Sequence, residues 1–475
     1  MEERYLAAVD LGSSKVALMI AKVEGDDVQV NYYGTRPSEG IRNGGVFNPQ
    51  LARGPVSSLI REAEEALGIK ITQVLVGTPG YQVIERVGEA LIDKSDSEGS
   101  VTREEIEALK NIALGEYPID NPRMESIYGC VPQSFSTEDQ IQMTDENEIV
   151  GMVSNIVGGH YKMFIGRKKL LDNIDQVFNG LEIARQEVFT PVAVGNVILT
   201  GDEKDSGVAL VDMGAGVTSV SVYKGGILRH YASIPFGGAT VTGDIRLESG
   251  FSERLSENIK LAYGACIPEK LSVLGDKIIR VNYPESGNYR DIKVEYLSRV
   301  IAAREKEIIS AILWEIQQSG FADELRGGVV LTGGAAEMTN ISALFSDMSG
   351  YNVRIGYPKR NYTCTGFMQA REAAAATCVG LVMEGKANQR LNCVGQVYAK
   401  TEEEPVPATE DETEDETPRS LFGEQQMEGV EVKKEKPKKV KPERKKGPTP
   451  VWVKRTKEGI KGFFESANGL FDDAD

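Results

Sequence analysis

Two carboxylates, Asp10 and Asp212, each end an apolar stretch that is typical of a buried β-strand, and a turn of small residues follows each. Glycine lets backbone N–H groups converge on an anion, and a carboxylate beside that anion can hold a metal ion. Asp-x-Gly turns are also common for conformational reasons alone, so one such hairpin is weak evidence of chemistry. The second turn contains Gly214, Ala215 and Gly216.

The hairpin pattern occurs twice. Tyr5–Lys22 and Gly207–Tyr223 each read as strand, carboxylate, turn and strand, which predicts two similar halves that face each other across a cleft. Ser13, Ser14 and Lys15 add donors to the first turn, as Gly216 and Thr218 do to the second. A third stretch, Gly327–Ala336, is a buried strand that ends in two glycines. Its plain interpretation is a strand-to-helix turn, although a glycine pair also lets a flat ring approach the backbone.

These three stretches resemble the first phosphate loop, the second phosphate loop and the adenosine motif of the actin-like ATPases. Ser256–Gly264 is similar to the helix that contacts the ribose in bacterial members, and Ile234–Ile245 to the glycine-pair segment before it. The resemblance implies ATP as a ligand, with Mg²⁺ held by Asp10 and Asp212 through water. It implies nucleotide contacts from Asp10, Gly12, Ser13, Ser14, Lys15, Asp212, Gly214, Ala215, Gly216, Thr218, Gly237, Gly238, Glu257, Lys260, Gly333, Gly334, Ala335 and Met338.

An insertion narrows the resemblance to one family. Residues 82–162 contain predicted strands and a helix that Thr102 and Glu105 open as a capping box, which is too regular for a loop. The bacterial cell-division family FtsA carries a subdomain at this point, and Val131–Phe135 and Gly151-Met152 also look like landmarks of that family. The resemblance covers residues 4 to 390. It implies that the insertion helps to join neighbouring protomers; a passive covering of the sheet edge is the alternative.

The expected fold class is α/β, an actin-like (ribonuclease H-like) two-lobed ATPase fold with an FtsA-type insertion. Within it we expect helices at Val56–Leu67, Gly243–Glu248 and Leu297–Gln318, and a strand at Lys293–Glu295. The expected parts are subdomain 1A at 1–81, the inserted 1C at 82–162, a 1A/2A connection at 163–200, 2A at 201–226, 2B at 227–296, 2A again at 297–400, a disordered linker at 401–448 and an amphipathic helix at 449–475.

Composition excludes several other classes of protein. The net charge is −17 and the pI is about 4.9, which argues against nucleic-acid binding by the body of the protein. Five cysteines without a C-x-x-C pair make a disulfide framework or a zinc site improbable. The sequence has no P-loop or Rossmann motif, no N-terminal signal, and no apolar run long enough to span a membrane.

The catalytic group for ATP hydrolysis is unknown from the sequence. In actin-like ATPases a glutamate or glutamine region commonly precedes the proline of the segment that orients the attacking water, whereas Thr190 precedes Pro191 here. A threonine hydroxyl is no base near neutral pH, so we expect slow turnover at most. Glu187, three residues upstream, stays open as an alternative.

The C-terminal region changes composition abruptly. An acidic run at 402–416 and a basic run at 433–446, both with prolines, predict a disordered linker. After it, Thr449–Phe471 places bulky apolar residues on one helical face beside a cationic flank, which predicts a helix that binds a membrane surface; docking on a protein is the alternative. The residues expected to bind lipid are Trp452, Lys454, Arg455, Lys457, Ile460, Lys461, Phe463, Phe464, Leu470 and Phe471.

The resemblance implies an ATP-binding scaffold at the cytoplasmic face of the cell inner membrane, at the division site. Its expected partners are the C-terminal tail of FtsZ on subdomain 2B, further copies of itself in filaments, membrane lipid and other division proteins. An assembly protein of a pilus or rod-shape system is the first alternative. A sugar kinase is the second, but we find no aspartate placed as a base for a sugar hydroxyl.

Overall fold

The structure is a computed structural model, and it describes residues 3–94, 99–138, 142–283, 288–359, 361–397 and 430–433. These ranges belong to one compact unit, Met1–Lys433. Within the described ranges, no helix combines the length and apolar character that crossing a membrane requires. All five cysteines are free thiols.

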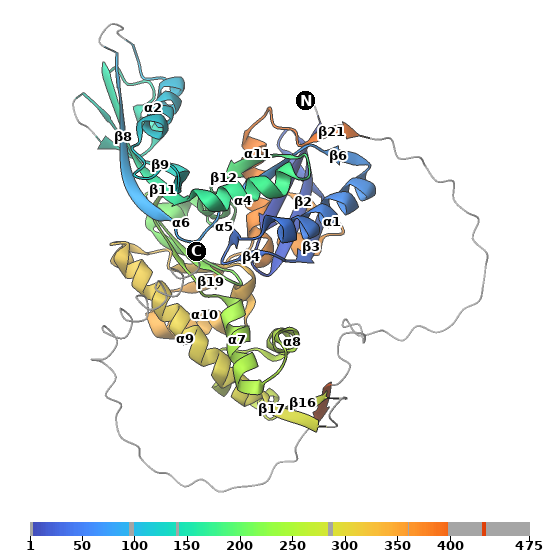
Figure 1. Ribbon diagram of the computed structural model, residues 1–475. Coiled ribbons are helices and arrows are strands. Elements are labelled where there is room, and N and C mark those ends of the chain that lie inside the picture. Colours follow the sequence, from blue (N-terminus) through green and yellow to red (C-terminus); the bar gives the residue numbers. More distant parts are fainter. Residues whose placement is uncertain are drawn as a thin grey trace. The chain divides into compact units, whose positions relative to one another are not determined.

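Two sheets form the centres of two lobes, and five strands of the first have the same arrangement as the five of the second (Figure 1). The first has the order β12 (Ala184–Val188), β7 (Gln73–Gly77), β1 (Arg4–Leu11), β2 (Lys15–Glu24), β3 (Asp27–Pro37) and β20 (Thr363–Cys364). The second has the order β19 (Val353–Ile355), β18 (Val329–Thr332), β13 (Val208–Met213), β14 (Thr218–Lys224) and β15 (Ile227–Ile234). In both, a central strand pairs antiparallel with the next strand in sequence and parallel with a later one, which confirms two similar halves.

Helices cover both sheets and complete their apolar cores. The first lobe contains α1 (Pro49–Leu67), α4 (Lys168–Asn179) and α5 (Thr190–Ile198), and the short α6 (Gly201–Ser206) follows. The second contains α7 (Gly238–Ser249), α8 (Glu253–Tyr263), α9 (Val294–Gln318) and α10 (Ile341–Ser349). The chain then returns to the first lobe, where α11 (Ala376–Ala387) packs on α5, β1 and β2.

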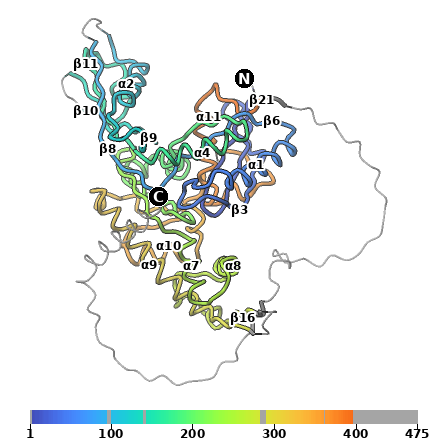
Figure 2. The backbone as a smooth tube through the Cα atoms, in the orientation of Figure 1, coloured from blue at the N-terminus to red at the C-terminus, as the bar shows by residue number. Residues whose placement is uncertain are grey.

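The insertion forms a subdomain with its own core. Its sheet has the order β10 (Gln142–Met143), β9 (Glu125–Thr137), β11 (Ile156–Arg167) and β8 (Ile84–Asp93), with α2 (Arg103–Glu116) packed on it and the short α3 (Glu146–Ile149) nearby. The predicted capping box is present, because Thr102 and Glu105 each accept a backbone N–H from the other. This sheet stands away from α1 and α11 in the backbone trace (Figure 2).

Several predicted boundaries need correction. Helix α1 begins at Pro49 rather than at Val56, because the Asn48 side chain caps it by accepting from the N–H groups of Gln50 and Leu51. Helix α7 begins at Gly238, and α9 begins at Val294, directly after β17 (Asn288–Lys293), so the predicted strand at Lys293–Glu295 is wrong.

The predicted domain limits also cut through the sheets. The limit after 226 separates β15 from β14, although the two strands pair along their length. The limit at 162 falls inside β11, which continues to Arg167. Residues 363–397, expected in subdomain 2A, lie in the first lobe, because β20 pairs with β3 and β21 (Val394–Val397) pairs with β6 (Ile69–Ile71).

Smaller sheets complete the unit. β4 (Ile41–Arg42) pairs with β5 (Gly45–Val46), and β16 (Ile278–Tyr283) lies between β17 and β22 (Val430–Lys433). β22 falls inside the segment 401–448 that we expected to be disordered, so four residues of that segment are a strand here. The rest of the expected linker and the whole expected membrane helix lie outside the described residues.

Candidate functional site

The two predicted hairpins lie opposite each other. Asp10 stands near the end of β1, opposite Ala17, and Asp212 stands at the matching place in β13, opposite Ser219. The two turns approach closely: a Cβ atom added to Gly216 would lie 2.7 Å from the Ser13 hydroxyl oxygen. Only glycine fits at position 216, because any side chain would separate the two turns.

A cavity of about 600 Å³ opens between the two lobes at these turns. This volume is in the range of small-molecule sites. Sixteen of the predicted nucleotide contacts line it: Asp10, Gly12, Ser13, Ser14, Lys15, Asp212, Gly214, Ala215, Gly216, Gly238, Glu257, Lys260, Gly333, Gly334, Ala335 and Met338.

Two of the predicted contacts lie outside this lining, Thr218 and Gly237. The Thr218 side chain is fully buried, and its hydroxyl donates to the Phe236 carbonyl at 2.9 Å. Its direction follows from strand register, because Thr218 pairs with the fully buried Met213 and paired residues share one face of a sheet. Gly237 packs under the second turn, where a Cβ atom would lie 2.3 Å from the Gly214 carbonyl oxygen.

Three residues of the cavity lining were not predicted from the sequence. Glu372 precedes α11 and Thr377 lies in its first turn, while Glu337 ends the 3-10 helix η4 (Gly334–Glu337). The Glu337 carboxylate accepts from the Ala373 N–H at 3.3 Å, which joins η4 to the segment that precedes α11. Burial and the nearby Glu372 raise the pKa of Glu337. The only sequence signal was the run of small residues at 373–376, which allows close packing.

The two aspartates form a partly buried acidic pair. Burial, partly offset by Lys15, raises the pKa of Asp10 to about 6. Burial and the negative charge of Asp10 raise the pKa of Asp212 to about 6. Across the described ranges, no three or more His, Cys, Asp or Glu side chains gather in a metal-holding cluster. Two carboxylates alone fit a cation such as Mg²⁺, which takes one or two carboxylates together with phosphate oxygens and water.

The first turn also presents groups that favour an anion. Ser13 Oγ accepts from the Gly44 N–H at 2.8 Å, so the hydroxyl proton of Ser13 stays available to donate into the cavity. Lys15 lines the same cavity. A polar hydroxyl and an ammonium beside backbone turns are the donors that a phosphate group requires.

The glycine pair after β18 approaches Asp212 directly. Gly333 has a φ of +85°, and a Cβ atom there would lie 2.3 Å from Asp212 Oδ1. No other residue type fits at this position without displacing the carboxylate. Gly334, Ala335 and Met338 continue the same wall of the cavity, as expected for a surface that a flat ring could approach.

A smaller chamber of about 130 Å³ adjoins the acidic pair and contains Thr190 and Thr78. The Thr190 hydroxyl donates to the Thr78 carbonyl at 3.1 Å. Glu187 does not line this chamber. Its carboxylate pairs with Arg185 at 2.7 Å and lines a separate pocket beside Cys130. Of the residues that the structure describes, only Asp10 and Asp212 therefore bring carboxyl groups to the lining of the chamber.

The duplicated lobes and the cleft between them define an actin-like fold. Among solved structures, the PilM-PilN type IV pilus biogenesis complex is similar, with a TM-score of 0.54 and 15% identity over 80% of this chain and 98% of that chain. At this identity the similarity shows the fold alone.

Sequence comparison identifies the family within this class. The family profile described as "Cell division protein FtsA" matches residues 209–380. The chain is 30% identical over 401 residues to the cell division protein FtsA of Neisseria meningitidis serogroup B, covering 82% of this chain and 94% of that protein. It is 25% identical over 391 residues to the FtsA of Bacillus subtilis strain 168, covering 82% and 85%. The chain belongs to the FtsA family of actin-like cell-division proteins.

Proposed function

We propose that this chain binds ATP together with Mg²⁺ in the cleft between the two lobes. The observation that carries the proposal is the pairing of Asp10 and Asp212, partly buried at matching places in two hairpins, beside donors suited to phosphate. The backbone N–H groups of the two turns and Lys15 would hold the phosphates, and the wall at Gly333–Ala335 would face the base. Bound Mg²⁺ neutralises phosphate charge and relieves the repulsion between the two carboxylates.

In this proposal, the binding of ATP changes the conformation of the chain, and ATP is hydrolysed only slowly. Hydrogen bonds from both hairpins to one set of phosphates favour a closed cleft. Within the described part of the chain, the lining of the Thr190 chamber has no carboxyl group besides the two aspartates and therefore no separate general base. Calorimetric titration of the purified chain with ATP, with Mg²⁺ or with excess chelator, tests the proposal. We expect saturable binding that weakens without Mg²⁺; no binding in either condition would refute it.

We further propose that the chain assembles into filaments and joins the division ring to the cytoplasmic face of the inner membrane. Family membership supports this role, and so does the amphipathic pattern of Thr449–Phe471. Weak single attachments become strong when many protomers bind together. Co-sedimentation with anionic liposomes tests the role by comparing the whole chain with one that ends at Gly447, each with and without Mg-ATP. We expect only the whole chain to pellet, and more so with ATP; equal behaviour of the two chains would exclude the tail as the anchor.

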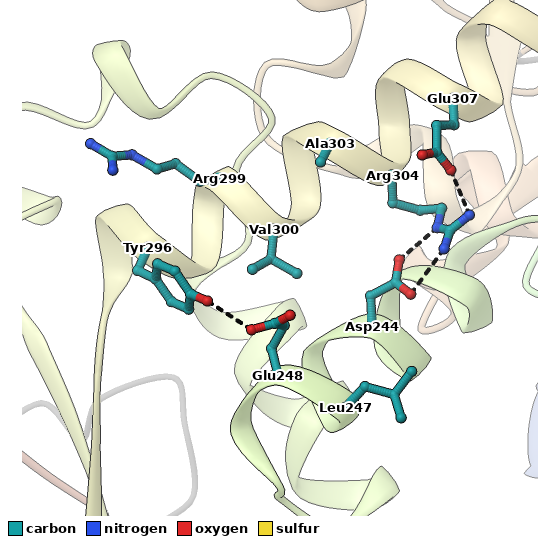
Figure 3. Close-up of a pocket in the computed structure, with 9 residues that line it drawn as sticks. All are labelled: Asp244, Leu247, Glu248, Tyr296, Arg299, Val300, Ala303, Arg304 and Glu307. Atoms are coloured by element: carbon teal, nitrogen blue, oxygen red, sulfur yellow. Dashed lines mark hydrogen bonds and ion pairs between the residues drawn. The ribbon is translucent and has the colours of Figure 1, made fainter.

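The partner of the second lobe in this proposal is the C-terminal tail of FtsZ. A groove of about 380 Å³ lies between α7 and α9, partly outside the 227–296 limits expected for the partner site (Figure 3). Leu247 is 78% exposed at this groove, and charged side chains surround it. Arg304 bridges Asp244 and Glu307, while the Tyr296 hydroxyl donates to Glu248 at 2.7 Å. An apolar centre with ordered charges on both sides suits a short peptide of mixed composition.

Leu247→Asp tests the groove, and Val273→Asp is the matched control. Val273 is 75% exposed on the same lobe but does not line the groove. In fluorescence anisotropy with a labelled FtsZ tail peptide, we expect Leu247→Asp to weaken binding about tenfold or more, and the control to bind normally. Equal binding by both variants would place the FtsZ site elsewhere. No binding of the peptide by the unmodified chain would favour the pilus or rod-shape alternative.

A further inference from the structure

The outer edge of β16 is paired with a strand from much later in the sequence. β16 forms a hairpin with β17, and β22 pairs antiparallel along its other edge. This second pairing runs from Ile278 opposite Lys433 to Val281 opposite Val430. A free strand edge presents unpaired N–H and C=O groups, to which an extended segment can add. β22 is therefore a strand that the later part of the chain adds to the second lobe.

The backbone register places the apolar positions of β22 on the core side of this sheet. Ile279 and Val281 of β16 are buried in the core of the second lobe. Val432 and Val430 stand opposite them, and residues directly opposite share one face of a sheet. A slip by one residue would bring the charged position Glu431 to this face instead. The alternation of valine with charged residues therefore specifies the observed register.

β22 lies where the charge of the surrounding sequence changes sign. The acidic stretch before it, residues 398–429, contains eleven Asp or Glu and two Lys or Arg. The basic stretch after it, residues 434–448, contains eight Lys or Arg and two Glu. The compact unit ends at Lys433. The acidic stretch is therefore attached to this unit at both ends, whereas the basic stretch leads from it to the amphipathic sequence that begins at Thr449.

Docking of β22 decides the length and the charge of the tether to Thr449. With β22 docked, the tether is the basic stretch alone, which has a net charge of +6 and spans at most about 50 Å. Without docking, the tether starts after Val397, has a net charge of −3 and spans at most about 170 Å. Anionic lipid attracts basic segments close to its surface, so the docked form has the more favourable tether.

We propose that β22 is a clasp, which keeps the acidic stretch out of the tether and leaves a short basic tether towards an anionic lipid surface. This inference rests on the proposed membrane attachment. It adds that the tether starts at the second lobe, beside β16, and that release of the clasp weakens attachment. Four residues are near the lower limit of strand length, so a small change in β22 is enough to release it.

A pair of substitutions without any change in charge tests the clasp in the full chain. Val430→Asn with Val432→Asn puts amides at the two core-side positions, and asparagine is disfavoured in strands. Val406→Asn with Val440→Asn is the matched control, because it makes the same change once in each neighbouring stretch. Hydrogen exchange of the β16 backbone amides reports docking. We expect faster exchange in the first variant and unchanged exchange in the control.

Co-sedimentation of the same chains measures the tether. The vesicles contain equal parts of phosphatidylglycerol and phosphatidylcholine. We expect the β22 variant to bind them about tenfold more weakly, which is the effect of one or two basic residues near an anionic surface, and the control to bind normally.

Replacement of acidic residues separates the effect of charge from other effects of the β22 variant. The sites are Glu402, Glu403 and Glu404, each replaced by glutamine. In the β22 variant, where they belong to the tether, we expect these changes to restore most of the affinity for the vesicles. In the unmodified chain, where the clasp keeps them out of the tether, we expect little change.

Two results overturn the inference alone. One is equal hydrogen exchange of β16 in the unmodified chain and the β22 variant, which would mean that β22 does not dock in solution. The other is faster exchange in the variant with unchanged binding to the anionic vesicles. An unmodified chain that binds no vesicles overturns the proposed membrane attachment and, with it, this inference; the exchange measurement still distinguishes that result from a failure of docking.

Discussion

Glu85 of the inserted subdomain and His230 of the second lobe form an ion pair, with Glu85 Oε1 3.4 Å from His230 Nδ1. Glu85 also accepts from the Tyr231 N–H and pairs with Lys162 at 2.8 Å. The inserted subdomain is continuous in sequence with the first lobe, since β8 follows β7 and α4 follows β11. The inserted subdomain is therefore joined covalently to the first lobe and by hydrogen bonds and ion pairs to β15 of the second lobe.

The same pair predicts a pH dependence of stability. Burial alone would lower the pKa of His230, but Glu315 and Glu85 outweigh it and raise the pKa to about 9. The charged groups around the ring are Glu85, Glu315, Lys162 and Arg229, from β8, α9, β11 and β15. Because the pKa is higher in the folded state, the stabilisation is complete below about pH 6.5 and is lost as pH rises to about 9.

We expect the free energy of unfolding in urea to fall by about 2–3 kcal/mol across this range. His230→Gln should remove most of this slope, while the more exposed His160, 38% exposed beside Glu89, serves as the control position. If His160→Gln flattens the profile and His230→Gln does not, the assignment to His230 is wrong.

Asp212→Asn is predicted to separate ligand binding from folding. Burial and the charge of Asp10 oppose ionisation of Asp212, so an uncharged amide of the same shape should leave the free energy of unfolding unchanged or raise it. The substitution also removes one of the two carboxylates that would hold Mg²⁺, so Mg-ATP binding should weaken roughly 10- to 100-fold. Thermal denaturation and calorimetric titration of the same sample measure both. Loss of stability and affinity together would mean that Asp212 is mainly structural.

Local patterns predicted the hairpins, but the far side of the cavity depends on tertiary structure. The strand, carboxylate and turn around Asp212 lie within one short stretch. The apolar pattern of its strands and the glycines of its turn were therefore enough to predict the hairpin. Glu372 and Thr377 reach the cavity only because the chain returns from the second lobe to pack on the first, which no local pattern specifies. Thr218 was predicted to face the ligand because its register with Met213 was not known. The hydrogen bonds from Lys260 to Gly238 and Thr242 were missed for the same reason, since these two acceptors lie on another helix.

Adjacent glycines provide a test of the contact between β18 and Asp212. Gly333→Ala places a Cβ atom 2.3 Å from Asp212 Oδ1 in a backbone conformation with φ of +85°. We expect a loss of about 2–4 kcal/mol in the free energy of unfolding and weaker binding of ATP. In Gly334→Ala the nearest atom would be 3.7 Å away, so stability should change by less than about 0.5 kcal/mol. Equal effects of the two substitutions would rule out this contact as the cause.

Glu187→Gln is predicted to leave ATP hydrolysis unchanged. The Glu187 carboxylate is bound to Arg185 at 2.7 Å and lines a pocket other than the Thr190 chamber, so it is not placed to activate water there. Single-turnover hydrolysis of Mg-ATP, measured as released phosphate, compares this variant with Thr190→Val. Thr190→Val removes the hydrogen bond from the Thr190 hydroxyl to the Thr78 carbonyl. Because this alters the geometry of the chamber, the slow rate of ATP hydrolysis should change. A tenfold loss in Glu187→Gln with no change in affinity, about 1.4 kcal/mol in the barrier, would instead make Glu187 the base and require a movement of β12 that brings it to the phosphates.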